Sequence, residues 1–283
     1  MDIVSRSKEE LSTNNTGSSV IKKCSIYKFH RTYRTTNLAT LQNTELQTDP
    51  LEIIYQDADY VAIDKPAGLL VHRSPQDKYA TEFAVQKLRD QIGQVVNPCH
   101  RLDRPTSGVL LFALNAEATR SAQELFIEHR MTKTYHALVR GWLDGEGVID
   151  YDLRNQEKPD KVQSAVTEYR CLNQSSVEIP VGRYPNGRFS LVELQPRTGR
   201  THQLRRHMKH LRHPILGDTR HGDGAQNQFL RSYCGQQLLM LRAMRLQMPH
   251  PTREGETLDI RAGVDTDFNA VLKKLGLQAT AHG

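Results

Sequence analysis

An uninterrupted apolar run from Val109 to Leu114 constrains the fold of this chain more than any other segment. Because successive residues of a strand point to opposite faces, an apolar run without alternation is typical of a strand that is covered on both faces. With 283 residues, the chain can also bury a full core. We therefore expect a central strand with helices packed against its sheet.

Shorter patterns on either side of this run predict the other elements. Strands are expected at 51–55, 60–64, 135–139, 166–171, 189–195, 238–246 and 257–260. Helices are expected after a Thr81 cap as far as Gly93, after an Asn115 cap, from near Thr201, and from near Asp267. Residues 143–160 resemble a loop. Strands outnumber helices without strict alternation, which favours an α+β domain with a mixed, mainly antiparallel sheet flanked by helices.

The first part of the chain has a different composition from the rest. Residues 1–50 are rich in Ser, Thr and Asn and have few periodic apolar positions. Such a segment buries too little apolar surface to offset the entropy of ordering it. We expect residues 1–50 to be a disordered extension and residues 51–283 to form one folded domain.

The charge is modestly basic, with 38 Lys and Arg against 32 Asp and Glu. A surplus of six permits an anionic partner without identifying it. The local distribution is more informative, because seven Arg or Lys and one acid, Asp218, lie between Arg197 and His221. That excess suits a polyphosphate.

The compartment is expected to be the cytoplasm. The four cysteines form no C-x-x-C pair, which indicates neither a disulfide framework nor a thiolate zinc site. No apolar segment suggests a secretory signal or a membrane span. Five histidines between His202 and His221 suggest a metal site, but no acidic third ligand and no H-E-x-x-H motif accompany them. We therefore predict no metal, and expect these histidines to contact phosphates or to make structural hydrogen bonds.

The loop from His100 to Gly108 carries the strongest functional signal. It reads His-Arg-Leu-Asp-Arg-Pro-Thr-Ser-Gly and places Asp103 between two arginines, directly before the apolar strand. Pro105 and Gly108 favour a fixed irregular backbone. An isolated loop aspartate usually makes an Asx turn or a salt bridge, here with Arg101 or Arg104. A carboxylate on a loop that a buried strand anchors is also a plausible catalytic group.

The whole string resembles the signature of the RluA-type family of RNA pseudouridine synthases. Three further stretches resemble family elements in the same order: Asp64 to Leu69, with Asp in place of the usual Asn, Lys133 to Tyr135, and Thr198 to Arg205 followed by His213 to Asp218. The resemblance covers roughly residues 51–262. It implies the pseudouridine synthase fold, with a catalytic cleft across the sheet, and an isomerase that needs no cofactor and no metal.

The resemblance also implies the site residues. The catalytic residues would be Asp103, Tyr135 and Arg205, and the substrate-binding residues Lys65, Arg101, Arg104, Thr106, Arg200 and His202. Arg205 would keep Asp103 ionised, although its position also fits a solvated helix face beside the stripe of Leu204 and Met208. Tyr135 would pack against the uracil, although an alternating strand also places such a residue in a core.

Within the family, the variants at 103–108 and 204–214 are most similar to a branch that modifies tRNA at uridine 65, the end of the T stem. The substrate would then be tRNA. We expect the protein to be a monomer that does not associate with a membrane. The same reaction on large-subunit ribosomal RNA is an alternative, because the catalytic strings are shared across the family. A non-catalytic RNA-binding protein and, more remotely, a metal-dependent hydrolase are alternatives from other classes.

Overall fold

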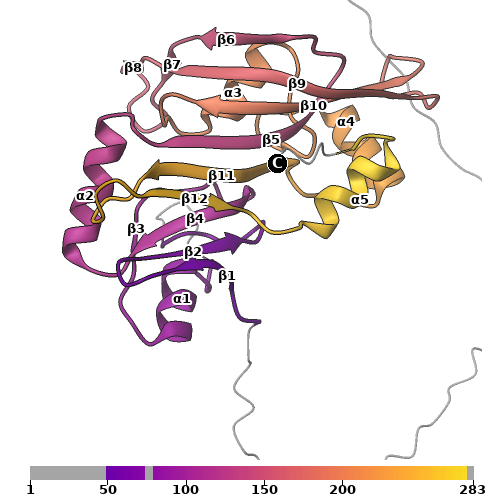
Figure 1. Cartoon of the computed structure of the whole chain (residues 1–283). Coiled ribbons are helices and arrows are strands. Elements are labelled where there is room, and N and C mark those ends of the chain that lie inside the picture. The colour runs from indigo at the N-terminus through magenta and orange to yellow at the C-terminus, as the bar shows by residue number, and fades with distance from the viewer. Residues whose placement is uncertain (1–48, 74–78, 279–283) are drawn as a thin grey trace, which may run out of the picture. The chain divides into compact units, whose positions relative to one another are not determined.

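The computed structural model of this chain describes residues 49–73 and 79–278. Within them, ten strands form one mixed sheet, in the order β1-β2-β4-β11-β5-β10-β9-β6, with β3 paired to β4 and β12 paired to β11 (Figure 1). Every printed pairing in this sheet is antiparallel except that of β4 with β11. The expected α+β class with a mainly antiparallel sheet is confirmed. The prediction for residues 1–50 lies almost entirely outside the described residues.

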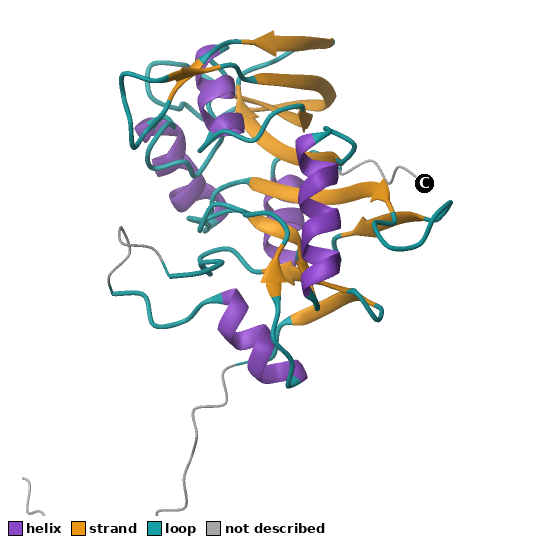
Figure 2. Cartoon of the chain, turned by 90° about the vertical axis from the view of Figure 1, so that its left-hand side faces the viewer, coloured by secondary structure: helices purple, strands orange, loops and turns teal. Residues whose placement is uncertain are grey.

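The strands of the large sheet have the following bounds: β1 Glu52–Gln56, β2 Tyr60–Lys65, β3 Asn97–Pro98, β4 Ser107–Ala113, β5 Thr132–Arg140, β6 Glu146–Asp150, β9 Val166–Val177, β10 Gly187–Pro196, β11 Leu241–Pro249 and β12 Thr257–Arg261. A separate pair is formed by β7 Leu153–Arg154 and β8 Val162–Gln163. The helices are α1 Ala84–Ile92, α2 Ala116–Ile127, α3 Gln203–His210, α4 Gly224–Phe229 with a following π-helical turn Leu230–Cys234, and α5 Thr266–Lys274. Figure 2 shows helices on both sides of the strands.

The apolar run forms β4, and all seven residues of this strand are buried. Its side chains alternate between two hydrophobic clusters. Leu110 and Phe112 pack with residues of α1, α3 and α5, whereas Val109 and Leu111 pack with residues of α2, β11 and β12. The strand is therefore covered on both faces, as its composition predicts.

Two predictions at the ends of elements are wrong. Thr81 does not cap α1, because Phe83 occupies the N-cap position and makes no side-chain cap bond. The first amides of α1 donate instead to backbone carbonyls of Leu70 and Val71 at 2.8 and 3.1 Å, so the helix needs no side-chain acceptor there. The strand expected to start at Leu238 begins at Leu241.

The expectation of a loop over residues 143–160 is also wrong, since it contains β6 and β7. In β6 only Ile149 is buried, and Val148 is 63% exposed. An edge strand of this kind is ordered by its pairing with β9, from Glu146 opposite Arg170 to Asp150 opposite Val166. Its own sequence carries little apolar alternation, so the period-2 signal is weak.

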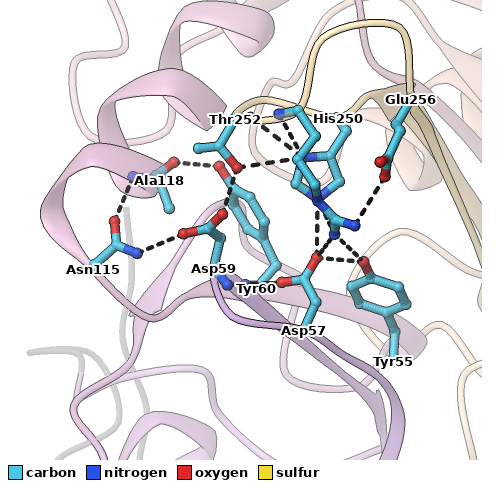
Figure 3. A network of polar contacts seen from close by, with 10 residues as sticks. Tyr55, Asp57, Asp59, Tyr60, Asn115, Ala118, His250, Thr252 and Glu256 are labelled. Atoms are coloured by element: carbon cyan, nitrogen blue, oxygen red, sulfur yellow. Dashed lines mark hydrogen bonds and ion pairs between the residues drawn. The ribbon is translucent and has the colours of Figure 1, made fainter.

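A polar network joins the turn between β1 and β2 to α2 and to the loop after β11 (Figure 3). Asp57 accepts a hydrogen bond from a ring nitrogen of His250 at 2.9 Å. Asp59 accepts from the Thr252 hydroxyl at 2.5 Å and from the side-chain amide of Asn115 at 2.9 Å. Asn115 also caps α2, as expected, by accepting from the amide of Ala118. The network fixes the end of the sheet beside α2. Within the described residues no helix is long and apolar enough to cross a membrane.

Candidate active site

A cavity of about 460 Å³ lies where three segments far apart in sequence meet. They are the loop before β4, the first half of β5, and the connection from β10 into α3. Seven of the nine site residues expected from the sequence line this cavity: Arg101, Asp103, Thr106, Tyr135, Arg200, His202 and Arg205. The structure therefore brings most of the expected residues together.

The loop that carries Asp103 is held on both sides of the carboxylate. Leu102 is buried in the core, and the amide of Thr106 donates to the carbonyl of Asp103 at 3.0 Å, closing a turn. His100 accepts from the amide of Leu111 at 3.1 Å, and burial lowers its pKa to about 3, so it remains neutral. These contacts leave the side chain of Asp103 20% exposed at the cavity.

Gly108 sets the distance between this loop and its neighbouring strand. Its φ is +107°, and a Cβ at this position would lie 2.1 Å from the carbonyl oxygen of Ala243 in β11. The two strands meet here in their parallel pairing. Only a residue without a side chain lets β4 begin this close to β11.

Arg205 connects Asp103 to a second, buried carboxylate. Its Nη1 donates to Oδ2 of Asp103 at 3.2 Å. Its Nε and Nη2 donate to the two carboxylate oxygens of Asp218, both at 2.8 Å. Planar bidentate pairing fixes the orientation of a guanidinium. Arg205 is thus held so that its remaining nitrogen faces Asp103.

Asp218 is fully buried and remains ionised. Burial alone would raise its pKa, but hydrogen bonds from Arg205 and from the amides of His221 and Arg220 lower it to about 2. The two charges of the Arg205–Asp218 pair compensate one another away from water. Sequence analysis did not assign Asp218 a function, although it is the only acid in a strongly basic stretch. That isolation is the signal that could have identified it.

Tyr135 lies in β5, and 8% of its surface is exposed. Burial raises the pKa of its hydroxyl, and the nearby carboxylate of Asp103 raises it further. Tyr135 packs within the hydrophobic core and also lines the cavity. Its position is therefore compatible both with a core residue and with one that contacts a bound base. A phenol beside a carboxylate can donate a proton and take it back.

Two residues expected to bind substrate, Lys65 and Arg104, do not line this cavity. Lys65 is completely buried, and its Nζ donates to the carbonyls of Pro66, Leu69 and Arg104 at 2.8, 2.8 and 3.2 Å. Burial lowers its pKa to about 7, against the opposing charges of Asp103 and Asp64. Lys65 therefore supports the loop from within and does not reach a phosphate.

Arg104 is exposed but lies outside the cavity. Its Nε donates to the carbonyl of Gly68 at 3.0 Å, and it lines a neighbouring hollow formed by residues 66–70 and 79–82 with Lys87. The direction of the Arg104 side chain cannot be predicted from sequence alone, since the irregular backbone of a loop has no period. The contact predicted for Arg104 is not made at this cavity.

The basic run is less uniform than its composition suggests. Arg197 makes a bidentate pair with Glu168, and Nε of Arg200 donates to the carbonyl of Ser164 at 2.9 Å. His207 is buried against Thr167 and the carbonyl of Tyr151, so it makes the structural hydrogen bonds that were one of the expectations. Among the described residues, no group of three or more His, Cys, Asp or Glu is arranged to hold a metal ion.

Comparison with known proteins is consistent with this geometry. The sequence model of a family described as RNA pseudouridylate synthase matches residues 59–210. The tRNA pseudouridine synthase C of Vibrio cholerae is 52% identical over 237 residues, which is 81% of this chain and 97% of the relative. The protein of the same name from Salmonella typhi is 49% identical, over 80% of this chain and 90% of the relative.

Solved structures resemble this fold as well. Human RNA pseudouridylate synthase domain containing 1 is 27% identical with a TM-score of 0.62, covering 78% of this chain and 87% of its own. Human RNA pseudouridylate synthase domain containing 4 has the same identity and TM-score, covering 81% and 94%.

Proposed function

This chain belongs to the RNA pseudouridylate synthase family, and we propose that its substrate is tRNA, modified at uridine 65 at the end of the T stem. Family membership makes it an isomerase that acts on RNA. The choice of tRNA rests on the relatives, which carry the name tRNA pseudouridine synthase C and share about half of their residues with this chain. The reaction takes place in the cavity around Asp103.

The observation that carries the assignment of the site is the ion pair between Asp103 and Arg205. The guanidinium of Arg205 donates a charge-assisted hydrogen bond to Asp103 and so holds its carboxylate in place. Arg205 is itself oriented by Asp218, so the arrangement does not depend on substrate. An ionised carboxylate on a supported loop, at the wall of a cavity, can attack an electrophilic carbon or remove a proton.

The chemistry explains why these groups suffice. Isomerisation breaks the glycosidic bond between C1′ and N1, turns the uracil, and joins C1′ to C5. The isomerisation transfers no electrons to an external acceptor. Side chains that bind the nucleotide, orient it and transfer protons can therefore carry out the reaction. Asp103 reacts with the nucleotide, and Tyr135 packs against the uracil and exchanges a proton with it.

The remaining cavity residues bind the RNA. The target base must leave its stack, at a cost of a few kcal/mol. Arg101 is exposed at the cavity, where its planar guanidinium can occupy the vacated position in the helix. Thr106 and Arg200 line the same wall and supply a hydroxyl and a positive charge toward the nucleotide.

We also propose the cytoplasm as the compartment and the monomer as the active form. The tRNA substrate supports the choice of compartment, and size-exclusion chromatography with light scattering tests the monomer. Ribosomal RNA of the large subunit is the second candidate substrate, because the residues around Asp103 touch the nucleotide and carry no information about its context.

Replacing Asp103 by Asn tests the proposal. The variant keeps the shape of the carboxylate but not its charge, so we expect it to bind RNA like wild type while turnover falls by about 10⁴-fold, the upper end of the range for a group that transfers a proton. Tritium release from RNA labelled at C5 of uridine measures turnover, on full-length tRNA and on ribosomal RNA transcripts in parallel.

Asp259→Asn is a control, since it removes an exposed carboxylate that pairs with Arg245, and neither residue lines the cavity. Near wild-type turnover by Asp103→Asn would contradict the role of Asp103. Faster release from ribosomal RNA than from tRNA would contradict the choice of substrate.

A further inference from the structure

Two imidazoles stand in series between Asp103 and the molecular surface. His202 lines the cavity, and its Nε2 lies 3.9 Å from Oδ2 of Asp103. Its other ring nitrogen, Nδ1, lies 2.9 Å from Nε2 of His221. The rings meet edge to face, with centroids 5.1 Å apart. His221 is partly exposed, so the pair extends from the cavity toward water.

The backbone holds His202 in this position. Its φ of 55° and ψ of 28° lie in the left-handed region, which residues other than glycine rarely adopt, and its side chain does not cap α3. Gln203 fixes the turn, because its side chain accepts from the amide of Arg200 at 3.0 Å and donates to the carbonyl of Val166 at 3.0 Å. Strain that the surroundings enforce is found at functional sites more often than elsewhere.

The second imidazole is positioned by the same carboxylate that orients Arg205. The amide of His221 donates to Oδ1 of Asp218 at 2.9 Å. Asn227 donates to the backbone carbonyl of Asp218 at 2.9 Å and so holds the loop from the other side. One buried aspartate therefore fixes both the partner of Asp103 and the outer member of the histidine pair.

Burial, together with the neighbouring positive charges, lowers the pKa of both rings and so favours the neutral state, which can accept a proton. Burial lowers the pKa of His202, and Arg205 and Arg220 lower it further, against the opposing carboxylates Asp103 and Asp218. For His221, burial together with Arg205, His202 and Lys209 lowers the pKa to about 4, against Asp218. The only carboxylate that faces the cavity end of the pair is Asp103 among the described residues.

We infer that His202 and His221 form a relay that carries the proton displaced from C5 of the target uracil to solvent, an inference that rests on the proposed function. When C1′ has joined C5, that carbon still holds its hydrogen, and the ring regains its double bond only when this hydrogen leaves as a proton. The step breaks the C5–H bond and leaves its electron pair in the ring.

The proton passes to Nε2 of His202, directly or through Asp103. His202 then releases its Nδ1 proton to Nε2 of His221, and His221 releases a proton to water. N1 of the product gains one proton from the hydroxyl of Tyr135, which takes one back from solvent, so the isomerisation has no net proton change. Exchange of both rings with water restores the starting tautomers.

The first test is His221→Asn, which interrupts the relay without altering the cavity wall. Under single-turnover conditions on a full-length tRNA transcript, we expect the rate to fall about 100-fold. We also expect a larger isotope effect than wild type when the uridine carries deuterium at C5, because removal of that hydrogen becomes rate-limiting. His72→Asn is the matched control, since His72 is exposed and does not line the cavity.

The second test is His202→Gly with added imidazole. Glycine adopts a left-handed φ without strain, so this variant should fold, and it opens a space for a free imidazole. We expect added imidazole to restore tritium release from RNA labelled at C5 and the pH profile of the wild-type rate. A residue that only supports the fold would give no such rescue.

Three outcomes would overturn the relay: a wild-type rate for His221→Asn, a slow rate with an unchanged isotope effect, or no rescue of His202→Gly by imidazole. These failures are distinct from failure of the proposed function. If wild type itself releases no tritium from tRNA, the proposed substrate is wrong. If wild type is active and the histidine variants behave as controls, only the relay is wrong.

Discussion

At the scale of single residues, the site depends on how one arginine is shared between two carboxylates. Two nitrogens of the Arg205 guanidinium donate to Asp218, and the third donates to Asp103. Breaking a buried ion pair by removing one charge leaves the other uncompensated. We therefore expect the loss of Asp218 to lower activity, although Asp218 does not line the cavity.

We expect Asp218→Asn to lose both stability and activity. The free energy of unfolding should fall by about 3–5 kcal/mol, because Arg205 and Asp218 are both almost completely buried. Urea unfolding measures this loss, and single-turnover tritium release measures activity. Glu168→Gln removes a similar bidentate partner from the exposed Arg197 and should cost less than about 1 kcal/mol. Equal losses in the two variants would contradict the importance of burial.

The pH dependence of stability follows from the same pair. The pKa of Asp218 falls from its ordinary 3.8 to about 2 on folding. The unfolded chain thus binds more protons in this range, so the stabilisation is complete above about pH 4 and is lost as the pH falls through about 2. Urea unfolding at several pH values should show the gap between wild type and Asp218→Asn narrowing below pH 4. A gap that stays constant down to pH 2.5 would refute this.

At the scale of elements, the catalytic loop depends on the parallel contact between β4 and β11. The paired residues, Ser107 with Arg242 and Gly108 with Ala243, are 135 residues apart in sequence. This contact fixes the loop that carries Asp103 relative to β5, which pairs with β11. Arg242 reinforces it by donating to the Ser107 hydroxyl at 3.2 Å. Close approach of two backbones therefore positions the loop.

Gly108→Ala tests this contact. The new methyl group would meet the carbonyl of Ala243, and the residue would keep a left-handed φ, so strain and steric overlap add. We expect a loss of unfolding free energy at least twice that of Gly93→Ala, where φ is +67° and no atom lies within 4 Å. Guanidinium unfolding of both variants measures the difference. Similar losses in the two variants would show that β11 moves to accommodate the methyl group without a measurable loss of stability.

At the scale of the whole molecule, the net charge of +6 is modest, and much of the basic run pairs within the protein. Binding of RNA should therefore involve few phosphates. Affinity falls with salt by roughly 0.7–0.9 log units per log unit of salt for each phosphate neutralised. We expect this slope for tRNA binding, measured by fluorescence anisotropy, to decrease by about one phosphate in Arg101→Ala. An unchanged slope would show that Arg101 neutralises no phosphate.

The sequence alone determined the parts of this protein that depend on local order. The apolar run predicted a strand covered on both faces, Asn115 and Gly93 marked helix ends that the structure contains, and the nine-residue loop identified Asp103. These features have short-range causes: side-chain alternation, capping and a continuous motif. The family could be recognised for the same reason.

Only the tertiary structure decided which distant groups face one another. It buried Lys65 against three carbonyls, turned Arg104 to another hollow, and made Asp218 the partner of Arg205. It also ordered β6 at the sheet edge through pairing with β9. Burial and ion pairing act through space between segments that share no period, so no local pattern encodes them. The candidate catalytic carboxylate is therefore recognisable from the loop sequence, but the charges that surround it are brought together only by the fold.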